Sequence, residues 1–440
     1  MNVQSLPELI PQLSPFKWYG KVTRVIGLMI ESKGPQASIG DLCYITTGRN
    51  LMTRVRAEVV GFRDEFVLLM PLNGTSEIAP GSLVEATGRP LEIKIGTQLI
   101  GSIVDSCGEL LTKESLPKGL SNFQTDNDPP NPIKRPRIKE LMSLGVRSID
   151  SLFTVGKGQR IGIFAGSGVG KSTLLSMLAR NSEADVNIIA LIGERGREVK
   201  DFIERDLGEE GLKRSIVVVA TSDQPALMRI KGAMTATAIA EYFRQQGMDV
   251  NLMMDSVTRV AMAQREIGLA IGEPPTSKGY TPSVFALLPR LLERSGTDEK
   301  GSITAFYTVL VDGDDLNEPI SDAVRGILDG HLVLDRKLAQ KGQFPAINVL
   351  KSISRVMSDI VTEEHRKAAE RLRYFVSVYE DNEDLINIGA YKKGSSPEID
   401  KAILMYPQIV SFLKQATDEN STIDQSIQTL IKLLGNGGRS

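Results

Sequence analysis

Residues 165–173 read AGSGVGKST, and this glycine-rich stretch constrains the possible folds of the chain more than any other feature. An apolar run at 161–164 leads into it, and a helical pattern with apolar residues such as Leu174 and Leu178 leads out of it. A loop between a buried strand and a helix directs backbone N–H groups and the positive end of the helix at an anion. The stretch therefore predicts a phosphate-binding loop in an α/β fold, rather than a chance glycine turn.

The loop also predicts how a nucleotide is held. Lys171 is expected to reach the β- and γ-phosphates, and the hydroxyl of Ser172 is expected to ligate Mg²⁺. The general motif begins with glycine, whereas this chain has Ala165 there, so Gly166 and Gly168 are expected to supply the flexibility. We expect ATP contacts from the whole loop, which comprises Ala165, Gly166, Ser167, Gly168, Val169, Gly170, Lys171, Ser172 and Thr173.

Two acidic residues follow apolar runs that resemble buried parallel strands. Asp255 ends the run NLMMD, where a carboxylate is placed to bind Mg²⁺; a helix cap is the alternative. Glu194 follows VNIIALI and should emerge at the same edge of the sheet, where it can polarise an attacking water. Arg195 beside it can approach the phosphates, although by spacing alone a Glu–Arg surface pair is the ordinary explanation of the two residues.

The 440 residues exceed one ordinary core and divide into segments of different character. Residues 1–20 are expected to form a mobile docking segment, with a frayed terminus as the alternative. Short β-rich runs over 21–90 predict a small β-barrel. Residues 91–360 alternate strands and helices, which predicts a nucleotide-binding ATPase domain with a mainly parallel sheet. Residues 361–440 are expected to form a C-terminal helical domain.

More local expectations accompany this division. Ser396 is expected to cap a helix that begins at Pro397. The polar, proline-rich stretch 121–137 is expected to be a linker or a surface crossing. Candidate buried strands are RIGIFA, VNIIALI, SIVVVAT, VNLMMDS and ITAFYTVLV, and candidate helices lie at 197–207 and 225–247.

Composition narrows the chemistry and the surroundings. The net charge of −2 gives no overall attraction for nucleic acid or anionic membranes, although a local basic patch stays open. The only histidines, His331 and His365, argue against a Ser–His–Asp triad or a His-rich metal site. Cys43 and Cys107 lie far apart, which fits structural thiols in a reducing compartment. The chain begins without a signal-peptide pattern, and no window resembles a membrane span, so a cytoplasmic location is expected.

Several longer motifs carry a family resemblance. GERGREV, MMDSVTR, DGDDLNEP and FPAINVLKSISRVM resemble the rotary ATPases. FAGSGVGKSTLL and ILDGHLVLDR are similar, more narrowly, to the flagellum-specific ATPases of type III protein export, which are related to the catalytic subunits of F- and V-type ATPases. The resemblance covers nearly the whole chain and is strongest over about 133–410. It implies a RecA-like P-loop ATPase domain between the barrel and the helical tail.

The resemblance implies roles that spacing alone does not. Glu194 corresponds to the catalytic carboxylate and Arg195 to its phosphate-contacting neighbour. Arg355, in the SISRV run, corresponds to an arginine that acts in trans on the neighbouring subunit's site; without the resemblance it is a surface arginine. Phe344 occupies the place of a tyrosine that packs on adenine. Because GERG and SISRV occur in one chain, each subunit could complete its neighbour's site, which suggests a homohexamer.

The implied function is that of an ATP-hydrolysing motor subunit of the flagellar export apparatus, which uses Mg-ATP at subunit interfaces to release chaperones and promote export. Implied partners are a stator-like regulator at the N-terminus, a coiled-coil stalk protein in the ring centre, chaperones with their substrates, and an export gate at the inner face of the plasma membrane. The acidic stretch Asp312, Asp314, Asp315, Asn317 and Glu318 either faces the stalk or is a solvated loop. No nucleic-acid partner is expected.

Four alternatives stay open at this point. An injectisome secretion ATPase is separated only by resemblance, since LINIGAYKKGSSPEIDKAI favours the flagellar group. A rotary synthase catalytic subunit fits AGSGVGKS and KSISRV less well. A ring-shaped RNA translocase is disfavoured by the slight acidity and by the lack of aromatic–basic interleaving before residue 100. A non-enzymatic ring protein would be expected to lack Glu194 or Asp255.

Overall fold

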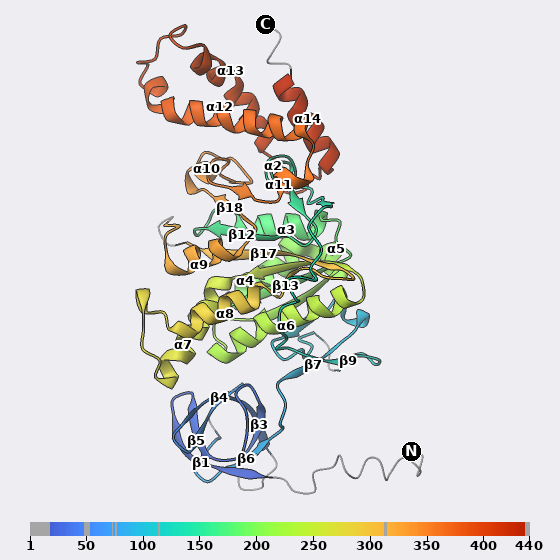
Figure 1. Cartoon of the computed structure of the whole chain (residues 1–440), viewed down its shortest axis with the longest axis vertical. Coiled ribbons are helices and arrows are strands. Elements are labelled where there is room, and N and C mark those ends of the chain that lie inside the picture. The colour runs from blue at the N-terminus through green and yellow to red at the C-terminus, as the bar shows by residue number, and fades with distance from the viewer. Residues whose placement is uncertain are drawn as a thin grey trace.

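The computed structural model describes residues 18–47, 53–72, 74, 77–112, 115–311 and 315–435. Figure 1 shows three tiers along the long axis: a β-barrel, a central sheet flanked by helices, and a group of helices at the other end. The expected α/β class and its three parts are therefore confirmed. The boundaries placed near residues 20, 90 and 360 stay predictions, and most of the expected docking segment lies outside the described residues.

The barrel closes in the order β1–β2–β5–β4–β3–β6. Alternation of apolar and polar residues gives it a small core of its own, which includes Ile30, Ile45 and Leu69. Cys43 is also buried there, and burial raises its pKa to about 12, which fits the expected structural thiol. The strands are β1 (Tyr19–Ile26), β2 (Met29–Lys33), β3 (Leu42–Thr47), β4 (Thr53–Arg63), β5 (Phe66–Pro71) and β6 (Leu83–Ala86).

The central sheet has nine strands, with the path β19–β18–β12–β17–β15–β13–β14–β8 and β16 beside β17. The strands from β18 to β8 are parallel, whereas β19 and β16 pair antiparallel. Their apolar runs are buried on both faces, as helices on both sides require. They are β8 (Ile103–Asp105), β12 (Arg160–Ala165), β13 (Val186–Ile192), β14 (Ser215–Ala220), β15 (Asp249–Asp255), β16 (Gly296–Thr297), β17 (Ser302–Leu310), β18 (Gly330–Leu334) and β19 (Ile353–Ser354).

All five candidate strands of the ATPase domain are present, within a residue at either end. The helix expected at 197–207 is α4 followed by a π-helical segment, η4, and the helix expected at 225–247 is α6. The helices of this tier are α3 (Lys171–Asn181), α4 (Gly196–Asp201), η4 (Phe202–Leu207), α5 (Gly208–Lys213), α6 (Ala226–Gln245), α7 (Val257–Ile271), α8 (Pro282–Leu292), α9 (Pro319–Ile327), α10 (Arg336–Gln340) and α11 (Met357–Ile360); short 3₁₀ turns are η3 (Thr97–Leu99) and η5 (Ser277–Gly279).

The connection between barrel and sheet is more ordered than the proline-rich sequence predicts. Residues at the start of the expected linker form β9 (Ser121–Gln124), which pairs antiparallel with β7 (Glu92–Ile95). β8 reaches the edge of the central sheet before the linker begins. The first four residues of the stretch expected to be a linker or a surface crossing therefore form an exposed strand, because pairing with a distant strand overrides the local composition. Two further short strands, β10 (Leu141–Met142) and β11 (Val155–Gly156), pair nearby.

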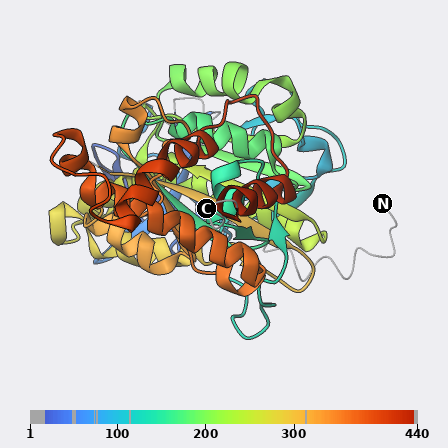
Figure 2. The same ribbon diagram turned by 90° about the horizontal axis from the view of Figure 1, so that it is seen from above.

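The C-terminal tier consists of α12 (Glu363–Asn387), α13 (Pro397–Leu413) and α14 (Ile423–Gly435), which lie over the central domain in Figure 2. The Ser396 side chain accepts from the Ile399 N–H, so the expected cap of α13 is confirmed. α12, α13 and α14 all contact α2 (Arg147–Leu152), which fixes this tier to the central domain. No described helix combines the length and the apolar character needed to cross a bilayer.

Candidate active site

The glycine-rich loop connects β12 to α3 at the carboxyl edge of the sheet. Gly168 and Gly170 have φ of 76° and 88°, a region that residues with a Cβ rarely adopt. Ala165, which departs from the general motif, is the last residue of β12 and is fully buried. Because that position is extended strand, glycine is not required there, and the departure from the motif leaves the loop intact.

A cluster of charged side chains lies beside the loop. The Lys171 Nζ is 2.5 Å from Asp255 Oδ1 and 3.4 Å from Glu194 Oε1. All three side chains are at most 15% exposed. Burial alone lowers the pKa of Lys171, but the two carboxylates outweigh it and the pKa is raised, so the lysine is charged. Burial raises the pKa of Glu194 and Glu198 adds to this, while Lys171 opposes it.

Strand order explains why these side chains meet. β13 and β15 are neighbours, and β17 lies between β15 and β12. Glu194 follows β13 and Asp255 ends β15, so both emerge where the carboxyl ends of parallel strands face the phosphate loop. The Thr308 hydroxyl of β17 donates to Asp255 Oδ1 at 2.7 Å. This bond orients the Asp255 carboxylate, at the end of β15, toward the neighbouring strand β17.

The cluster opens into a cavity of about 590 Å³. Eight of the nine loop residues line it, the exception being the buried Val169. Sequence reasoning did not single out Thr308, which donates to Asp255. It also did not assign a role to the further residues that line the cavity, which are Gly193, Glu198, Arg205, Asp206, Ser222, Arg259, Leu310 and Val311. The MMDSVTR motif contains Arg259, but nothing in its spacing assigns that arginine to the cavity.

Arg259 is the most informative of the residues that sequence reasoning missed. Its side chain packs on Gly193, where an added Cβ would lie 2.7 Å from the Arg259 Cβ. Its Nε is buried without a hydrogen-bond partner among the described residues. The half-buried guanidinium makes one weak contact, from Nη1 to the Met262 sulfur at 3.8 Å, so its Nε stays available at the wall of a cavity rich in backbone donors. Such a group fits an anionic ligand such as a triphosphate.

The other predicted residues lie at different distances from the cavity. Arg195 lines it but is 82% exposed and pairs with Glu198 at 3.6 Å. The Phe344 ring lies against Gly170, and with Gly342, Lys414, Gln415 and Ala416 it lines a smaller recess of about 280 Å³. Each position suits the expected role, and the roles themselves stay predictions.

Arg355 is not among the residues that line the phosphate cavity. It follows β19 and is exposed; its backbone N–H donates to the Asp329 carbonyl, and its guanidinium donates to the Arg325 carbonyl at 3.4 Å. Asp329 adjoins the start of β12, whereas the phosphate loop follows the end of β12, about 17 Å further along the strand. Arg355 therefore does not reach the phosphate loop of its own chain.

The described part of the acidic stretch is an ion-paired surface loop. Lys278 lies 3.1 Å from Glu318 and 3.9 Å from Asp315. Asp312 and Asp314 lie outside the described residues, so their expected contact with a stalk stays a prediction.

The residues also fit a magnesium ion. Ser172, in the first turn of α3, and Asp255 offer the hydroxyl and carboxylate oxygens that Mg²⁺ prefers. The Asp255 carboxylate already faces a positive charge beside the phosphate loop, since its Oδ1 lies 2.5 Å from the Lys171 ammonium.

Three family models match successive parts of the chain. Residues 22–88 match the ATP synthase alpha/beta family β-barrel domain, and residues 145–354 match the nucleotide-binding domain of the same family. Residues 361–432 match the type III secretion EscN ATPase C-terminal domain. The chain therefore belongs to the ATP synthase alpha/beta family, and it is a P-loop ATPase.

The relatives define its position in that family more narrowly. The flagellum-specific ATP synthase of Bacillus subtilis (strain 168) is 68% identical over 99% of this chain and 100% of the relative. That of Salmonella typhimurium (strain LT2) is 47% identical over 98% of this chain and 96% of the relative. Among solved structures, the assembled ATPase EscN of enteropathogenic Escherichia coli superposes with a TM-score of 0.88 at 45% identity, covering 94% of this chain and 100% of EscN. The similarity groups the chain with the flagellum-specific ATP synthases.

Proposed function

We propose that the chain is an ATP-hydrolysing motor subunit of a flagellar type III export apparatus, working as a homohexamer with Mg-ATP at its subunit interfaces. The observation that carries the proposal is the split geometry of the catalytic groups. Lys171 and Glu194 line one phosphate cavity, and Asp255 contacts Lys171 behind it, while the exposed Arg355 lies at the other end of β12. A ring with heterologous interfaces brings the Arg355 of one subunit to the cavity of the next.

Each side chain then has a defined task in hydrolysis. Lys171 and the loop N–H groups hold the β- and γ-phosphates, and Arg259 supplies a further cation at the cavity wall. Glu194 orients the attacking water, for which its raised pKa favours accepting a proton transiently. When bound, Mg²⁺ neutralises charge on the β- and γ-phosphate oxygens. The neighbour's Arg355 stabilises the charge that develops as the γ-phosphoryl group is transferred to water.

The partners proposed for the ring rest on the family resemblance, and a solved relative supports one of them. The structure of EscN with its central stalk EscO, which superposes on this chain with a TM-score of 0.86, supports a stalk protein in the ring centre. A stator-like regulator at the N-terminus, chaperones with their export substrates, and a membrane export gate complete the proposed set. The ring would work in the cytoplasm, peripherally attached at the inner face of the plasma membrane.

Two variants and a dilution series test this function. ATPase activity per subunit should rise with protein concentration, because each complete site needs two chains. Lys171→Ala should lose binding of a fluorescent ATP analogue. Arg355→Ala should keep that binding and lose roughly 10³-fold or more in kcat, as removal of an arginine finger does. Activity that is independent of concentration, together with unchanged kcat in assembled Arg355→Ala, would contradict shared sites.

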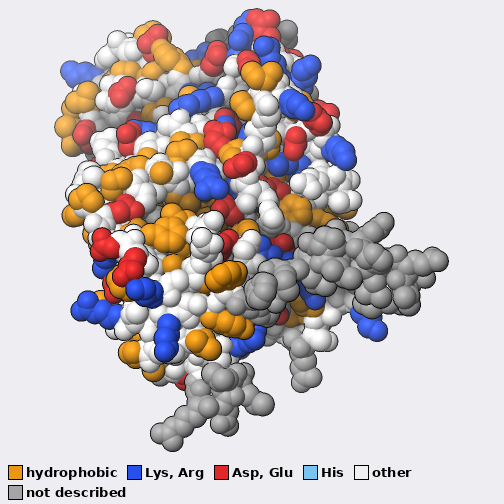
Figure 3. All heavy atoms as spheres, turned by 60° about the horizontal axis from the view of Figure 1, so that its bottom comes forward, with side chains coloured by type: hydrophobic (Ala, Val, Ile, Leu, Met, Phe, Trp, Pro, Cys, Tyr) orange, Lys and Arg blue, Asp and Glu red, His pale blue; other side chains and the backbone are white. Residues whose placement is uncertain are grey.

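The injectisome ATPase is the second candidate, and the close superposition on EscN favours keeping it. Proteins that co-purify with the chain from its own cells separate the two: flagellar regulator and chaperones support the first reading, and injectisome components support the second. The RNA translocase has weaker support, because acidic and basic side chains are interspersed on the barrel end shown in Figure 3.

A further inference from the structure

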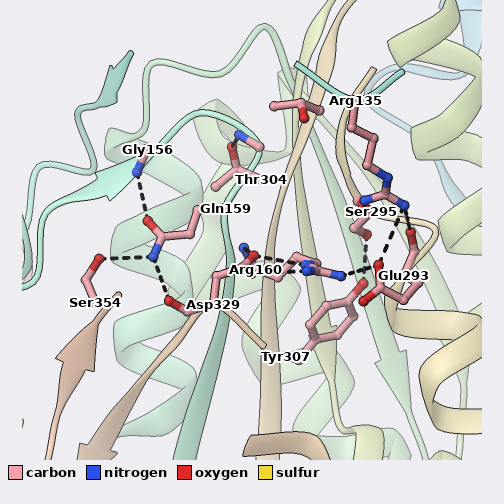
Figure 4. Close-up of polar contacts among 12 residues, drawn as sticks. Arg135, Gly156, Gln159, Arg160, Glu293, Ser295, Thr304, Tyr307, Asp329 and Ser354 are labelled. Atoms are coloured by element: carbon pink, nitrogen blue, oxygen red, sulfur yellow. Dashed lines mark hydrogen bonds and ion pairs between the residues drawn. The ribbon is translucent and has the colours of Figure 1, made fainter. Parts of the chain in front are cut away.

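A buried hydrogen-bond network holds the segment that carries Arg355, and it lies outside the phosphate cavity. Its centre is Gln159, which is fully buried just before β12. The Gln159 side-chain oxygen Oε1 accepts from the Gly156 N–H at 2.9 Å. Its Nε2 donates to the Asp329 carbonyl at 3.1 Å and to the Ser354 hydroxyl at 3.0 Å (Figure 4). Gln159 therefore joins the start of β12 to the residue immediately before Arg355.

The same network fixes the backbone of Arg355. The Ser354 hydroxyl donates to the Thr154 carbonyl at 2.9 Å, so this side chain is bonded as donor and as acceptor. The Arg355 N–H donates at 3.0 Å to the Asp329 carbonyl that Gln159 also contacts. Two adjacent residues are thus anchored to the residues that immediately precede β12 and β18.

Asp329 is itself held in a fixed orientation. Its carboxylate accepts from the Arg160 backbone N–H at 3.0 Å and from two guanidinium nitrogens of Arg160 at 2.9 and 3.0 Å. Arg160 also pairs with Glu293 at 2.6 Å (Figure 4). A two-pronged arginine–carboxylate pair defines direction as well as distance, so the Asp329 carbonyl is presented to Arg355 in one geometry.

Close packing of β19 on β18 gives a second, independent constraint. A Cβ added to Gly330 would lie 2.6 Å from the Ile353 carbonyl oxygen and 3.1 Å from the Ser354 Cα. The two strands therefore approach more closely than any side chain at residue 330 allows. This contact defines the distance between β19 and β18, and hence the position of the Arg355 backbone, which follows β19.

Arg355 combines this fixed backbone with an exposed guanidinium whose hydrogen bond to the Arg325 carbonyl is long, at 3.4 Å. A cation that acts on a separate molecule loses less conformational freedom when its backbone is already placed. We propose that Gln159, Ser354 and Asp329 are positioning residues that set Arg355 for the neighbouring subunit's ATP. This inference rests on the proposed function, in which Arg355 completes a site in trans.

The competing explanation is that Gln159 acts on the ATP site of its own chain, because β12 runs from Gln159 directly into that chain's phosphate loop. Mixed rings distinguish the two. Lys171→Ala has a defective phosphate loop but an intact Arg355 segment. If Gln159 acts through Arg355, Lys171→Ala subunits beside Gln159→Met subunits supply the intact arginine. If Gln159 acts through β12, the Lys171→Ala subunits do not correct the defect, and mixing restores no activity.

The experiment uses full-length protein and measures kcat, binding of a fluorescent ATP analogue, and activity after mixing with Lys171→Ala. Gln159→Met and Ser354→Ala should lower kcat roughly 10- to 100-fold, because about 1 Å of misplacement of a reacting group costs on that order. Their nucleotide affinity should be unchanged, and mixing should raise activity well above the sum of the separate proteins. Ser354→Ala removes only one hydroxyl and carries the test if Gln159→Met does not fold.

Thr304→Val is the matched control. The Thr304 hydroxyl of β17 accepts from the Gly158 N–H at 2.8 Å, in the turn that leads into Gln159, and Thr304 is almost as buried as Gln159 (Figure 4). Its side chain makes no hydrogen bond to β19 among the described residues. Thr304→Val should lower the stability of the protein without lowering its kcat.

Two outcomes would overturn the positioning role but leave the trans site intact. In the first, mixing with Lys171→Ala restores activity to Arg355→Ala but not to Gln159→Met or Ser354→Ala. In the second, Gln159→Met and Ser354→Ala both keep the parent kcat. No rescue of Arg355→Ala overturns the trans site and this inference with it.

Discussion

At the scale of single residues, the site depends on how two carboxylates share one lysine. Asp255 is the more buried of the two and lies closer to Lys171, while Glu194 contacts the same ammonium at a longer distance. Burial raises the pKa of Glu194, and the Lys171 ammonium at 3.4 Å only partly opposes this. This asymmetry suits a metal-binding role for Asp255 and a water-orienting role for Glu194.

Thr308 provides a test of the metal-binding role. Thr308→Val keeps the shape of the side chain but removes the donor to Asp255 Oδ1. We expect about 10- to 100-fold weaker apparent Mg²⁺ affinity in the ATPase assay, because groups that orient metal ligands contribute on that order. Binding of the nucleotide without Mg²⁺ should be unchanged. Equal Mg²⁺ dependence in the variant and the parent protein would count against Asp255 as a ligand.

At the scale of elements, α12 is docked on α2 through a buried histidine. His365 lies in the first turn of α12, and its Nε2 is 2.6 Å from the Ser151 carbonyl of α2. Its Nδ1 is buried without a partner among the described residues, so the native protein has no place for a second ring proton. Burial lowers the pKa of His365, and the bond to the carbonyl only partly opposes this.

Acid should therefore weaken the attachment of the C-terminal helices. Because the pKa of His365 is lower in the folded protein than the ~6.5 of an unfolded chain, its stabilising effect is complete above that pH and falls as the pH drops below it. The loss can reach about 1.4 kcal/mol per pH unit. Thermal melts at pH 7.5 and 5.5 should show a larger drop for the parent protein than for His365→Gln. Equal drops would remove His365 as the cause.

At the scale of the whole molecule, one buried ion pair joins the barrel to the ATPase domain. Lys231 of α6 lies 2.5 Å from Glu58 of β4, and both side chains are at most 10% exposed. Burial raises the pKa of Glu58, and Lys231 opposes that effect. α6 packs on β13, β14 and β15, so the pair connects the barrel to the strands behind the catalytic carboxylates.

Breaking this pair should cost more than replacing it. Lys231→Met leaves the Glu58 carboxylate buried without its partner, which typically costs about 3–5 kcal/mol, whereas Glu58→Leu with Lys231→Met should recover most of that loss. Calorimetric melts of the two variants give the comparison, and hydrogen exchange in α6 localises the effect. A double variant as unstable as the single one would mean that packing, rather than charge, joins the two domains.

The sequence by itself determined the features that depend on neighbours along the chain. A strand, a glycine-rich turn and a helix are covalently adjacent, so AGSGVGKST was sufficient to predict the phosphate loop, and apolar runs ending in Glu194 and Asp255 predicted their place at the sheet edge. Only the tertiary structure decided which residues from elements far apart in the chain meet at the site. β17 inserts between β12 and β15 and brings Thr308 to Asp255. α7 delivers Arg259 to the cavity, and the length of β12 separates Arg355 from its own phosphate loop. These relations arise from pairing and packing between residues far apart in the chain, for which local pattern carries no signal.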